Sequence, residues 1–598
     1  MFFRQITLAV LISTGSLIDF EETIAGSISS PENWESEFSS FPKDANGWST
    51  IQPSEDSRLM YVSSSEGSDS TGKIYTASDN EINGNPHHPQ NKLRAFASIE
   101  AAIKNMRPGY PDWILLKRGD VWHIDRTIEM VRGRSALERS VISFYGDASD
   151  RPSIRTSESD AVSFVNGTAN YSVLNGLHFY AQNRDPKSDT FAGFDSLGSQ
   201  IGLKILENEN LTEGILIEDC HFDFYAVNYA QVARGGSGKL RDVTVRRSFF
   251  TNAYDANKHS QGLFSANASM LLEENIFDHN GWYKQSLDGG VGKEKAEGQA
   301  TIYNHNTYFA NQKNTIFRRN IFLRASSIHN KFTANSSGET DSIRASNILV
   351  DGNYYQEGEI GISAGGNKDF NTGPRWRNIV IRGNTLTAMG VAQPTGRNLG
   401  WGIEISDWSR GLVEKNRFYN WGHPERVNNT YAIRVKGHTS DLDIQGNSFQ
   451  NIRGSTNLKT GLITVDWKHS DDVSVHQNHM VQTVDSPLPF ISEVGVAKDV
   501  IFIGNALHYD ERDAPAFMQD GKLVNFDRWQ TSFGDRSGNY RVTGTIQYGK
   551  SIQGYLASIG ESQTEIEDFV ARAVSESRLE PNYKYKAGEV LDYISNQN

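Results

Sequence analysis

Side chains that can take or give protons gather in one part of the sequence. Histidine, lysine and tyrosine recur there at short intervals, and the set comprises Lys258, His259, Tyr303, His305, His329 and Lys331. A neutral His or Lys of suitably tuned pKa could remove a proton from a substrate, and Tyr303 or a second His could protonate a leaving oxygen. The three histidines could alternatively form a zinc site, although their spacing matches no short metal motif.

Bases and cations without paired acids favour β-elimination on a polysaccharide that contains uronate. A cation would neutralise the sugar carboxylate and stabilise the enolate-like charge that develops when the C5 proton leaves. Arg434 and Lys436 would bind carboxylates at neighbouring subsites. The expected substrate-binding set is completed by one acid and three aromatic residues of the kind that stack on sugar rings, namely Glu404, Trp282, Trp401 and Trp408.

A repeat must position these residues. Between residues 348 and 507, a phrase of alternating apolar residues, two polar residues and an asparagine recurs six times. The asparagines are Asn353, Asn384, Asn416, Asn447, Asn478 and Asn505, so the steps are 31, 32, 31, 31 and 27 residues. Each phrase describes a short strand with one buried face, and a buried asparagine at a fixed turn can bond the coils above and below it. The period predicts a stacked β-solenoid and not helical repeats, which need apolar residues at three-and-four spacing.

A second strand lies between one asparagine phrase and the next, as in SIHNKFTAN (327–335) and TYAIRVKGH (430–438). Stacked in order, these strands make one wall, on which alternate residues point to solvent. The alternation predicts that His329 and Lys331 both point outward, as do the charged substrate-binding residues on later coils. The catalytic candidates should therefore share one face of the solenoid.

Hydrolysis would need two carboxylates that face each other across the scissile bond. The candidates on this wall are Glu404 and Asp466, which the repeat places two coils apart. That spacing is roughly 10 Å, at the upper edge of the carboxylate separation in inverting glycosidases. Hydrolysis therefore stays open beside elimination.

The N-terminal part of the repeat region carries a family resemblance. It contains YVSSSEGSDSTGK (61–73), a helical segment SIEAAIKNM (98–106) with Ser98 as N-cap, and DWILLKRGDVW (112–122). This order resembles the entry to right-handed parallel β-helix proteins of the pectin-lyase-like superfamily. The resemblance covers about residues 61–545. It implies an all-β, single-stranded parallel β-helix of about a dozen coils, similar to secreted bacterial proteins that degrade polysaccharides. This fold hosts lyases, hydrolases, esterases, epimerases and adhesins, so the resemblance alone does not fix the activity. No catalytic residue is carried over, because the sequence matches neither the core motifs of pectate lyases nor the Asp pairs of polygalacturonases.

The flanking segments complete the predicted organisation. Residues 1–20 have an apolar core and resemble a secretory signal peptide, and residues 21–60 form a polar linker or arm. The β-helix domain with its N-terminal cap follows at 61–545, and residues 546–598 have helical spacing and are expected to cap the open C-terminal end. We therefore expect the protein to be exported, to the periplasm or outside the cell.

Composition narrows the partners. The formal charge of −13 without a long basic run argues against nucleic acid, and no segment after the signal could span a bilayer. The single cysteine, Cys220, excludes disulfides within the chain and stands in an asparagine slot, which predicts a buried small residue. The cofactor is open: SDSTG (68–72) and GDASD (146–150) could ligate calcium, although both are also ordinary turns. The chain could be a monomer or a homotrimer.

Three functions follow from this interpretation. The first is an exported polysaccharide lyase that acts on an acidic, uronate-containing polymer in a groove on the β-helix face. The second is a glycoside hydrolase or uronate epimerase on the same scaffold. The third is a non-catalytic protein that binds polysaccharide or serves at a surface, in which the histidines are structural.

Overall fold

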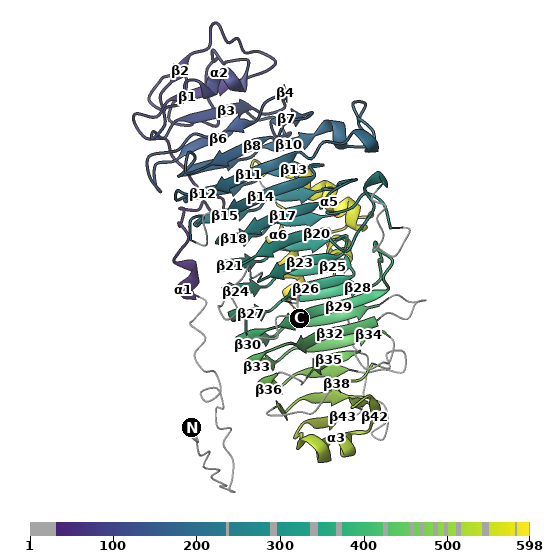
Figure 1. Cartoon of the computed structure of the whole chain (residues 1–598). Helices are drawn as coiled ribbons and strands as arrows, with labels where there is room; N and C mark the ends of the chain where they lie inside the picture. Colours follow the sequence, from purple (N-terminus) through teal and green to yellow (C-terminus); the bar gives the residue numbers. More distant parts are fainter. Residues whose placement is uncertain are drawn as a thin grey trace.

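The computed structural model describes residues 32–234, 238–286, 296–334, 345–365, 374–422, 429–454, 460–466, 470–481, 488–494, 500–509, 516–540, 549–580 and 583–596. The signal peptide expected at residues 1–20 lies outside these residues, and so do residues 287–295 of the loop 281–300. The described chain forms one long solenoid with a helical region against its side (Figure 1).

Three long sheets form the walls of the solenoid, one with 15 strands and two with 14. Successive strands belong to different sheets, so β3 (Trp113–Lys117), β4 (Val121–Ile124) and β5 (Ile128–Glu129) lie in the first, second and third sheet, and β6 (Ser140–Tyr145) returns to pair with β3 in parallel. Antiparallel pairs occur where the chain turns back at the solenoid ends. They join β1 (Leu59–Val62) to β2 (Ile74–Tyr75) and β41 (Phe517–Gln519) to β42 (Lys522–Val524). The predicted all-β parallel β-helix is therefore confirmed.

The third sheet carries most of the residues singled out in the sequence. After β5 it comprises β8 (Val162–Val165), β11 (Ile201–Glu207), β14 (Val227–Ala233), β17 (Gln261–Ala266), β20 (His305–Ala310), β23 (Ile328–Thr333), β26 (Ile360–Ala364), β29 (Leu399–Ser406), β32 (Asn429–Lys436), β35 (Gly461–Asp466), β38 (Ile491–Val494), β41 (Phe517–Gln519) and β42 (Lys522–Val524). All but the last pair are parallel, so outward residues of successive coils stack in columns.

The repeated asparagines form a continuous internal ladder between the first and second sheets. Asn353 donates through both its backbone N–H and Nδ2 to Oδ1 of Asn384, each at 2.9 Å, and Nδ2 also donates to the carbonyl oxygen of Phe317 at 3.0 Å. The same pattern runs from Asn275 to Asn505. The expectation that each asparagine bonds the coils on both sides is confirmed.

Cys220 and Ser248 occupy the ladder position in two earlier coils. The backbone N–H of Cys220 donates to Oγ of Ser248, whose own N–H donates to Oδ1 of Asn275. Cys220 is fully buried, and this burial raises the pKa of its thiol to about 12. A buried small residue was expected here, and the structure confirms it.

A bend in the third sheet interrupts the alternation of inward and outward residues. On β23, His329 and Asn330 are consecutive and both fully buried, and on β20 the same holds for Asn306 and Thr307. The residue at the bend is often glycine because space is short: a Cβ on Gly262 would lie 2.6 Å from the carbonyl oxygen of Asn306. Two neighbouring inward positions therefore replace the strict period of two.

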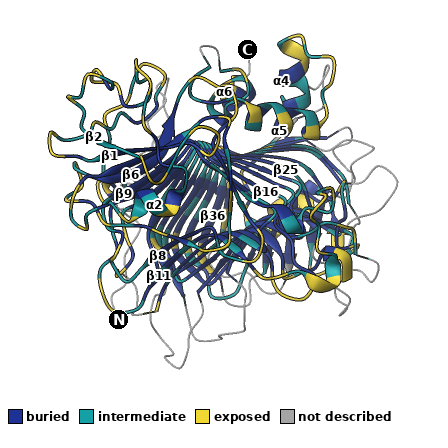
Figure 2. Ribbon diagram, turned by 90° about the horizontal axis from the view of Figure 1, so that it is seen from above, coloured by how far each residue is buried: buried dark blue, intermediate teal, exposed yellow. Residues whose placement is uncertain are grey.

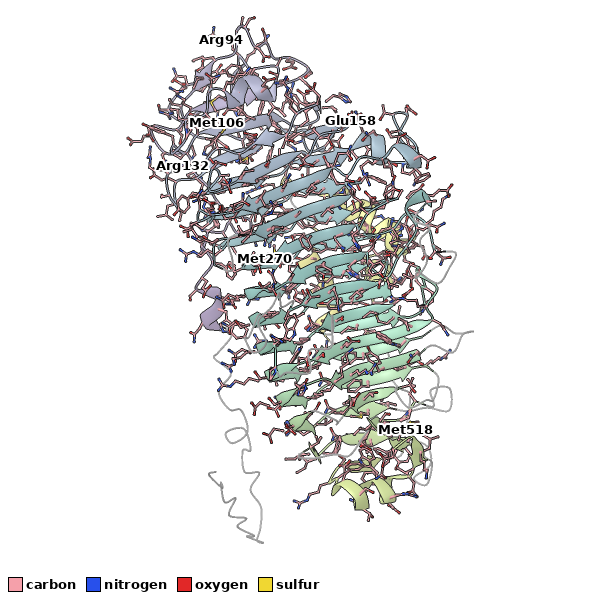
Figure 3. All side chains as sticks on the ribbon, viewed as in Figure 1. Arg94, Met106, Arg132, Glu158, Met270 and Met518 are labelled. Carbon is pink, nitrogen blue, oxygen red and sulfur yellow. The ribbon has the colours of Figure 1, made fainter. Side chains whose placement is uncertain are left out.

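Both ends of the solenoid are covered. At the N-terminal end, α2 (Ile99–Ile103) begins after its N-cap Ser98, whose Oγ accepts from the backbone N–H of Ala101 at 3.2 Å, as predicted. At the other end, α3 (Phe526–Phe533) adds Phe526 and Trp529 to the core. The core is continuous between them, from Met106 near α2 through Met270 in the middle of the solenoid (Figure 3).

The C-terminal helices lie along the side of the solenoid. They are α4 (Ile552–Ser558), α5 (Ile566–Ser575) and α6 (Ala587–Ser595), which pack together beside the outer face of the second sheet (Figure 2). Their apolar residues meet Ile276 and Ile321, which lie on β19 (Ile276–Asp278) and β22 (Ile321–Leu323). The helices expected between 546 and 598 are present, but α3 covers the open end in their place.

The N-terminal arm also runs along the solenoid. The short helix α1 (Glu32–Glu35) and the residues after it place Trp34 and Phe38 against Ile316, Leu349 and Val380 on the first sheet. The arm thus packs on a different face from α4–α6. Within the described part of the chain, none of the helices has the length and apolarity needed to cross a membrane.

Candidate active site

A groove of about 880 Å³ crosses the outer face of the third sheet from β11 to β23. This volume is typical of sites that bind ligands. Its polar lining comes from the strands and from the segments before and after them, and comprises Lys204, Arg234, His259, Gln261, Tyr303, His305, Tyr308, Lys331 and Arg397. The structure thus brings four of the six predicted catalytic residues to one groove.

The parallel register arranges the groove floor in two columns. The first column joins Ile201, Val227, Gln261, His305 and Ile328 on successive strands. The second column joins Lys204, Ala230, Phe264, Tyr308 and Lys331. His305 and Lys331 therefore lie on adjacent coils, whose strands are about 4.8 Å apart.

Lys331 is the most deeply placed cation of the groove. It is 7% exposed, and its Nζ donates to Oγ of Ser363 at 3.0 Å and to the carbonyl oxygen of Gly365 at 3.2 Å. Burial lowers the pKa of Lys331 to about 8, while the charge of Glu404 opposes the shift and that of Lys436 adds to it. Lys331 is thus a lysine that can lose its proton near neutral pH.

His305 is a neutral ring at the bottom of the groove. It is 3% exposed, its Nδ1 has no hydrogen-bond partner among the described residues, and its ring stacks on Tyr308 with centroids 5.7 Å apart. Burial, followed by the charges of Lys331 and Arg397, holds the pKa of His305 well below its usual range. His305 can therefore donate or accept a hydrogen bond without adding charge.

His259 and Tyr303 stand at the rim. Both are exposed, Tyr303 by 51%, and their rings meet edge to face with centroids 5.2 Å apart. They come from the segments that precede β17 and β20, so they project beside the floor formed by His305. A substrate in the groove would reach these two side chains from solvent.

Arg397 is a groove residue that the sequence patterns did not indicate. Its Nε and Nη2 both donate to Oε2 of Glu359, at 3.0 and 2.7 Å, and Nη2 also donates to Oγ of Ser327 at 2.6 Å. Glu359 is fully buried and accepts further bonds from Thr395. No described residue accepts from Nη1 of Arg397, which leaves that end of the guanidinium for a ligand.

The prediction that His329 points outward to solvent is wrong. His329 points into the solenoid because of the bend, with zero exposure. Its Nδ1 lies 3.0 Å from Nδ2 of Asn306, at the end of a second internal ladder that runs through Asn228 and Asn280. Burial lowers the pKa of His329 to about 3, so the ring is a neutral structural group. The alternative of a zinc site formed by His259, His305 and His329 is therefore not supported, because His329 faces the interior.

Three other predicted residues lie away from the groove. Lys258 is exposed but does not line it. Trp408 is fully buried in the core, where its Nε1 donates to the carbonyl oxygen of Ala364 at 3.1 Å, so it cannot stack on a sugar. Trp282 is half-buried, donates to the carbonyl oxygen of Arg324 at 2.9 Å and contacts the ring of His279 at a tilted angle, with centroids 4.5 Å apart. The rings and indole N–H groups of Trp408 and Trp282 therefore serve internal packing and hydrogen bonding.

The remaining predicted substrate-binding residues form a cluster on later coils of the same sheet. Glu404 is 6% exposed, bridges to Nζ of Lys436 at 2.9 Å and accepts from the hydroxyl of Tyr431 at 2.9 Å. Although burial alone would raise it, the neighbouring Lys436 and Lys331 hold the pKa of Glu404 below its usual value. Arg434 pairs with Glu404 in the register, and its guanidinium lies 5.7 Å from the ring of Tyr431.

This cluster does not supply the acids that hydrolysis requires. In the register, Glu404 is followed by Arg434 and then Thr464, whereas Asp466 pairs with Val494 two positions further along. The two carboxylates therefore lie in different columns. The positive charge of Lys436 also keeps the carboxyl group of Glu404 ionised. Glu404 is therefore a structural carboxylate and not a proton donor.

Among the described residues, one cluster has side chains close enough together to bind a metal ion. It consists of His178, His221 and Asp223 on the second sheet. The two imidazole rings are stacked almost parallel, 8° apart with centroids at 4.6 Å, so their in-plane lone pairs do not converge on one ion. Burial is the main cause that lowers the pKa of both rings, and the positive charge of Arg151 lowers them further. Of the two calcium candidates, SDSTG uses Asp69 to hold the backbone of Ser98 at α2.

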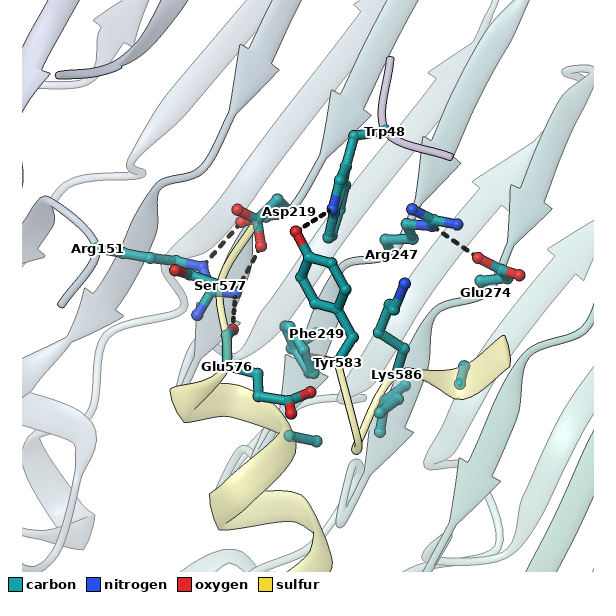
Figure 4. Close-up of a pocket in the computed structure, with 13 residues that line it drawn as sticks. Trp48, Arg151, Asp219, Arg247, Phe249, Glu274, Glu576, Ser577, Tyr583 and Lys586 are labelled. Atoms are coloured by element: carbon teal, nitrogen blue, oxygen red, sulfur yellow. Dashed lines mark hydrogen bonds and ion pairs between the residues drawn. The ribbon is translucent and has the colours of Figure 1, made fainter. Parts of the chain in front are cut away.

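A second cavity lies between the second sheet, the arm and the C-terminal helices (Figure 4). Its volume of about 20 Å³ holds roughly one water molecule. Arg151 donates to Asp219 at 2.5 Å across it, and Nε1 of Trp48 donates to the hydroxyl of Tyr583 at 2.8 Å. The cavity therefore marks the joint that holds the arm and the helices to the solenoid.

Several solved protein structures are similar to this chain, although sequence comparisons find none. No family model matches the sequence, and no curated protein matches it. Among solved structures, the chain is similar to a lacto-N-biosidase from Eubacterium ramulus, with 12% identity, a TM-score of 0.32 and coverage of 82% of this chain and 68% of the other.

Two further likenesses are of the same order. The A-module of a mannuronan C-5 epimerase from Azotobacter vinelandii matches with 11% identity and a TM-score of 0.35, over 72% of this chain and 91% of the other. A rhamnogalacturonan lyase matches with 12% identity and a TM-score of 0.31, over 80% of this chain and 99% of the other. At these values the fold assignment rests on the strand topology, and the activities named belong to the matched proteins.

Proposed function

We propose that the protein is an exported polysaccharide lyase that cleaves an acidic, uronate-containing polysaccharide by β-elimination in the groove on the third sheet. The composition of the groove supports this proposal. Its described lining contains lysine, arginine, histidine and tyrosine, and it includes neither aspartate nor glutamate. A polyanion therefore meets cations, and a hydrolysis that needs two opposed acids lacks them.

Arg397 is the residue best placed to bind the carboxylate of the reacting sugar. Glu359 and Ser327 hold its guanidinium through Nε and Nη2, so Nη1 is presented in a fixed direction. A guanidinium stays charged at all relevant pH values. It would therefore stabilise the negative charge that spreads onto the carboxylate when the C5 proton is removed.

Lys331 is the proposed general base. As a neutral amine it has two N–H bonds and one lone pair, and the acceptors Ser363 and Gly365 lie at 3.0 and 3.2 Å, where they can take both N–H bonds. The lone pair is then left for the C5 proton of a sugar in the groove. The lowered pKa of Lys331, about 8, supplies a useful fraction of the neutral amine near pH 7.

Tyr303 is the proposed acid. Its hydroxyl reaches the rim of the groove, where the leaving sugar oxygen would emerge, and His259 packs edge to face on its ring. His305 stays neutral and offers a hydrogen bond to the substrate from the floor. This assignment keeps charge on Arg397 and leaves proton transfer to Lys331 and Tyr303.

Lys331 takes the C5 proton, the electron pair of that C–H bond forms the C4–C5 double bond, and the bond from C4 to the glycosidic oxygen breaks. Tyr303 gives its proton to that oxygen and later regains one from water or from the protonated lysine. Each cleavage yields one unsaturated uronate end and one new reducing end.

Incubation with a panel of alginate, pectate, glycosaminoglycans and bacterial exopolysaccharides tests the proposal. Ultraviolet absorbance and reducing ends should rise together with at least one acidic polymer. Reducing ends without absorbance would refute elimination in favour of hydrolysis, and changed uronate stereochemistry by NMR without new ends would identify an epimerase. Retention on a polymer gel with none of these products would indicate a binding protein.

Matched variants then locate the reaction. Lys331→Met and Arg397→Met should each lower kcat/KM, by about 10²- to 10³-fold, if base and carboxylate partner are correct. Lys313→Met is the control, because Lys313 is an exposed lysine on β21 (Lys313–Arg318) of the first sheet. An equal loss in the control would refer the effect to stability and not to the groove.

A further inference from the structure

The groove is open toward the N-terminal coils and closes toward the C-terminal coils. At β11, the Lys204 side chain is 39% exposed and Ile201 is half-buried. Four coils later, at β23, Lys331 is 7% exposed, and on β26 the next residues of the two columns, Ile360 and Ser363, are each 3% exposed. At its two ends the floor thus differs in exposure, being half-buried at β11 and buried at β23 and β26.

An ordered wall causes this closure. Residues 391–399 lie between β28 (Thr385–Met389) and the start of β29, and Leu399 packs on Ile328 and Ile360. These two isoleucines are outward-facing floor residues, so the segment stands on the sheet at the point where the groove ends. Trp401, a predicted substrate-binding residue, is half-buried and packs against the same apolar cluster.

Buried polar contacts hold this wall in place. Glu359, which is fully buried, accepts hydrogen bonds from the backbone N–H of Thr395 at 2.7 Å and from its hydroxyl at 2.6 Å. The carbonyl oxygen of Pro394 accepts from the backbone N–H of Ser286 at 2.7 Å, which ties the wall to the neighbouring loop. A buried carboxylate with all its bonds made is a rigid anchor, because breaking one bond would leave a buried group unpaired.

The residues proposed for catalysis lie against the closed end. Lys331 is on β23, one coil from β26, and His305 is on β20, two coils from it. Arg397 belongs to the wall itself. The distance from the base to the wall is therefore about 5 to 10 Å along the solenoid axis.

We infer that the protein acts on chain ends and releases a short product from a terminus of the polymer. A long chain can enter from the open side at β11, but it cannot continue past Leu399 and Ile360. Only about one or two sugar units fit between the cleaved bond and the wall at this coil spacing. This inference rests on the proposed function and specifies its mode of action.

Product sizes early in the reaction test the inference. With an acidic polymer that gives absorbance, mass spectrometry at low conversion should show one short unsaturated product from the first turnovers, and viscosity should fall slowly relative to absorbance. A broad ladder of products with an early collapse of viscosity would overturn the inference while leaving the lyase proposal intact. Absence of absorbance with every polymer would overturn the lyase proposal and this inference with it.

A wall variant adds a readout that folding alone does not change. In Glu359→Gln, the anchor loses its charge against Arg397 and one acceptor for Thr395, so the wall should loosen and the product should lengthen into a mixture. Lys313→Met should keep the wild-type product. Unchanged product size in a folded Glu359→Gln, as judged by its melting curve, would contradict the role of the wall, and the wild-type product distribution decides the matter if that variant does not fold.

Discussion

The pH dependence of kcat/KM is the sharpest test of the proposed base. Burial lowers the pKa of Lys331 from 10.5 to about 8. At pH 7, about one lysine in ten is then neutral, whereas an ordinary lysine would be neutral in about one molecule in 3,000. Burial therefore increases the concentration of usable base about 300-fold at this pH.

The protonation state of Lys331 that reacts determines whether kcat/KM rises or falls with pH. Because only the neutral amine can accept the C5 proton, kcat/KM should rise about tenfold from pH 6 to pH 7 and level off above the pKa of about 8. Initial rates of ultraviolet absorbance at low substrate, measured between pH 5.5 and 9.5 at constant ionic strength, give this profile. If Lys331 instead bound the carboxylate as a cation, kcat/KM would fall above the same pKa.

The variant Lys331→Arg distinguishes a general base from a carboxylate-binding cation, and Lys313→Met is its control. Lys331→Arg keeps the positive charge but cannot act as a base near neutral pH, so we expect a loss of at least about 10²-fold if Lys331 is the base. Retention of most activity in Lys331→Arg, or a wild-type profile that is flat between pH 6 and 8, would refute the assignment. Lys313→Met should reproduce the wild-type profile in both shape and height.

Further predictions concern the asparagine ladder, the buried His329 and the loss of stability caused by burying Lys331. Asn384→Ala removes four side-chain hydrogen bonds inside the solenoid, and calorimetry should show a loss of about 3 to 5 kcal/mol in the free energy of unfolding. His329→Asn extends the internal asparagine ladder and should keep kcat/KM within about threefold of wild type, whereas a large loss in a folded variant would return His329 to the site. Lys331→Met removes a buried ammonium and should raise the free energy of unfolding at pH 7 by up to about 3 kcal/mol. Since the folded-state pKa is the lower one, that gain should shrink as the pH rises from about 8 toward 10.5, and a gain that does not change with pH would contradict the buried charge.

The sequence allowed the solenoid to be predicted because its strongest constraint is periodic. A ladder asparagine must recur once per coil, since each one bonds the next, and this requirement appears directly in the steps between Asn353 and Asn505. The same logic placed Cys220 in the ladder, and the strands between the asparagine phrases placed His305 on the wall that carries the groove.

The bend in the third sheet explains the main error. Two consecutive inward residues shift everything on one side of them by a single position, so His329 and Lys331 could not both point outward although they are two apart. A signal did exist: Gly262, Asn306 and Gly361 share the bend position of His329 on other coils, and small or amide residues there indicate a crowded interior. Comparing equivalent positions between coils would have revealed it.

Arg397 could not have been found by the same means. It lies in a segment between two strands, where no period constrains residue types, and its role depends on Glu359 and Ser327, which are distant in the sequence. Trp408 illustrates the opposite case, because an aromatic residue at a coil corner fits the core as well as it fits a sugar. Loop residues and corner aromatics become interpretable only when the neighbouring coils are in place.

The overall charge of the protein bears on how an acidic polymer would reach the groove. A formal charge of −13 repels a polyanion at long range, whereas Lys204, Arg234, Lys331 and Arg397 attract it within the groove. Added salt screens the long-range repulsion, the half-buried Lys204 and the exposed Arg234, but it screens the buried Lys331 far less. Moderate salt should therefore act mainly on the capture of the polymer, while the electrostatics of the proton-transfer step stay nearly constant. The solenoid makes this separation possible because the strands that bury Lys331 are held by internal ladders, independently of the charged surface around them.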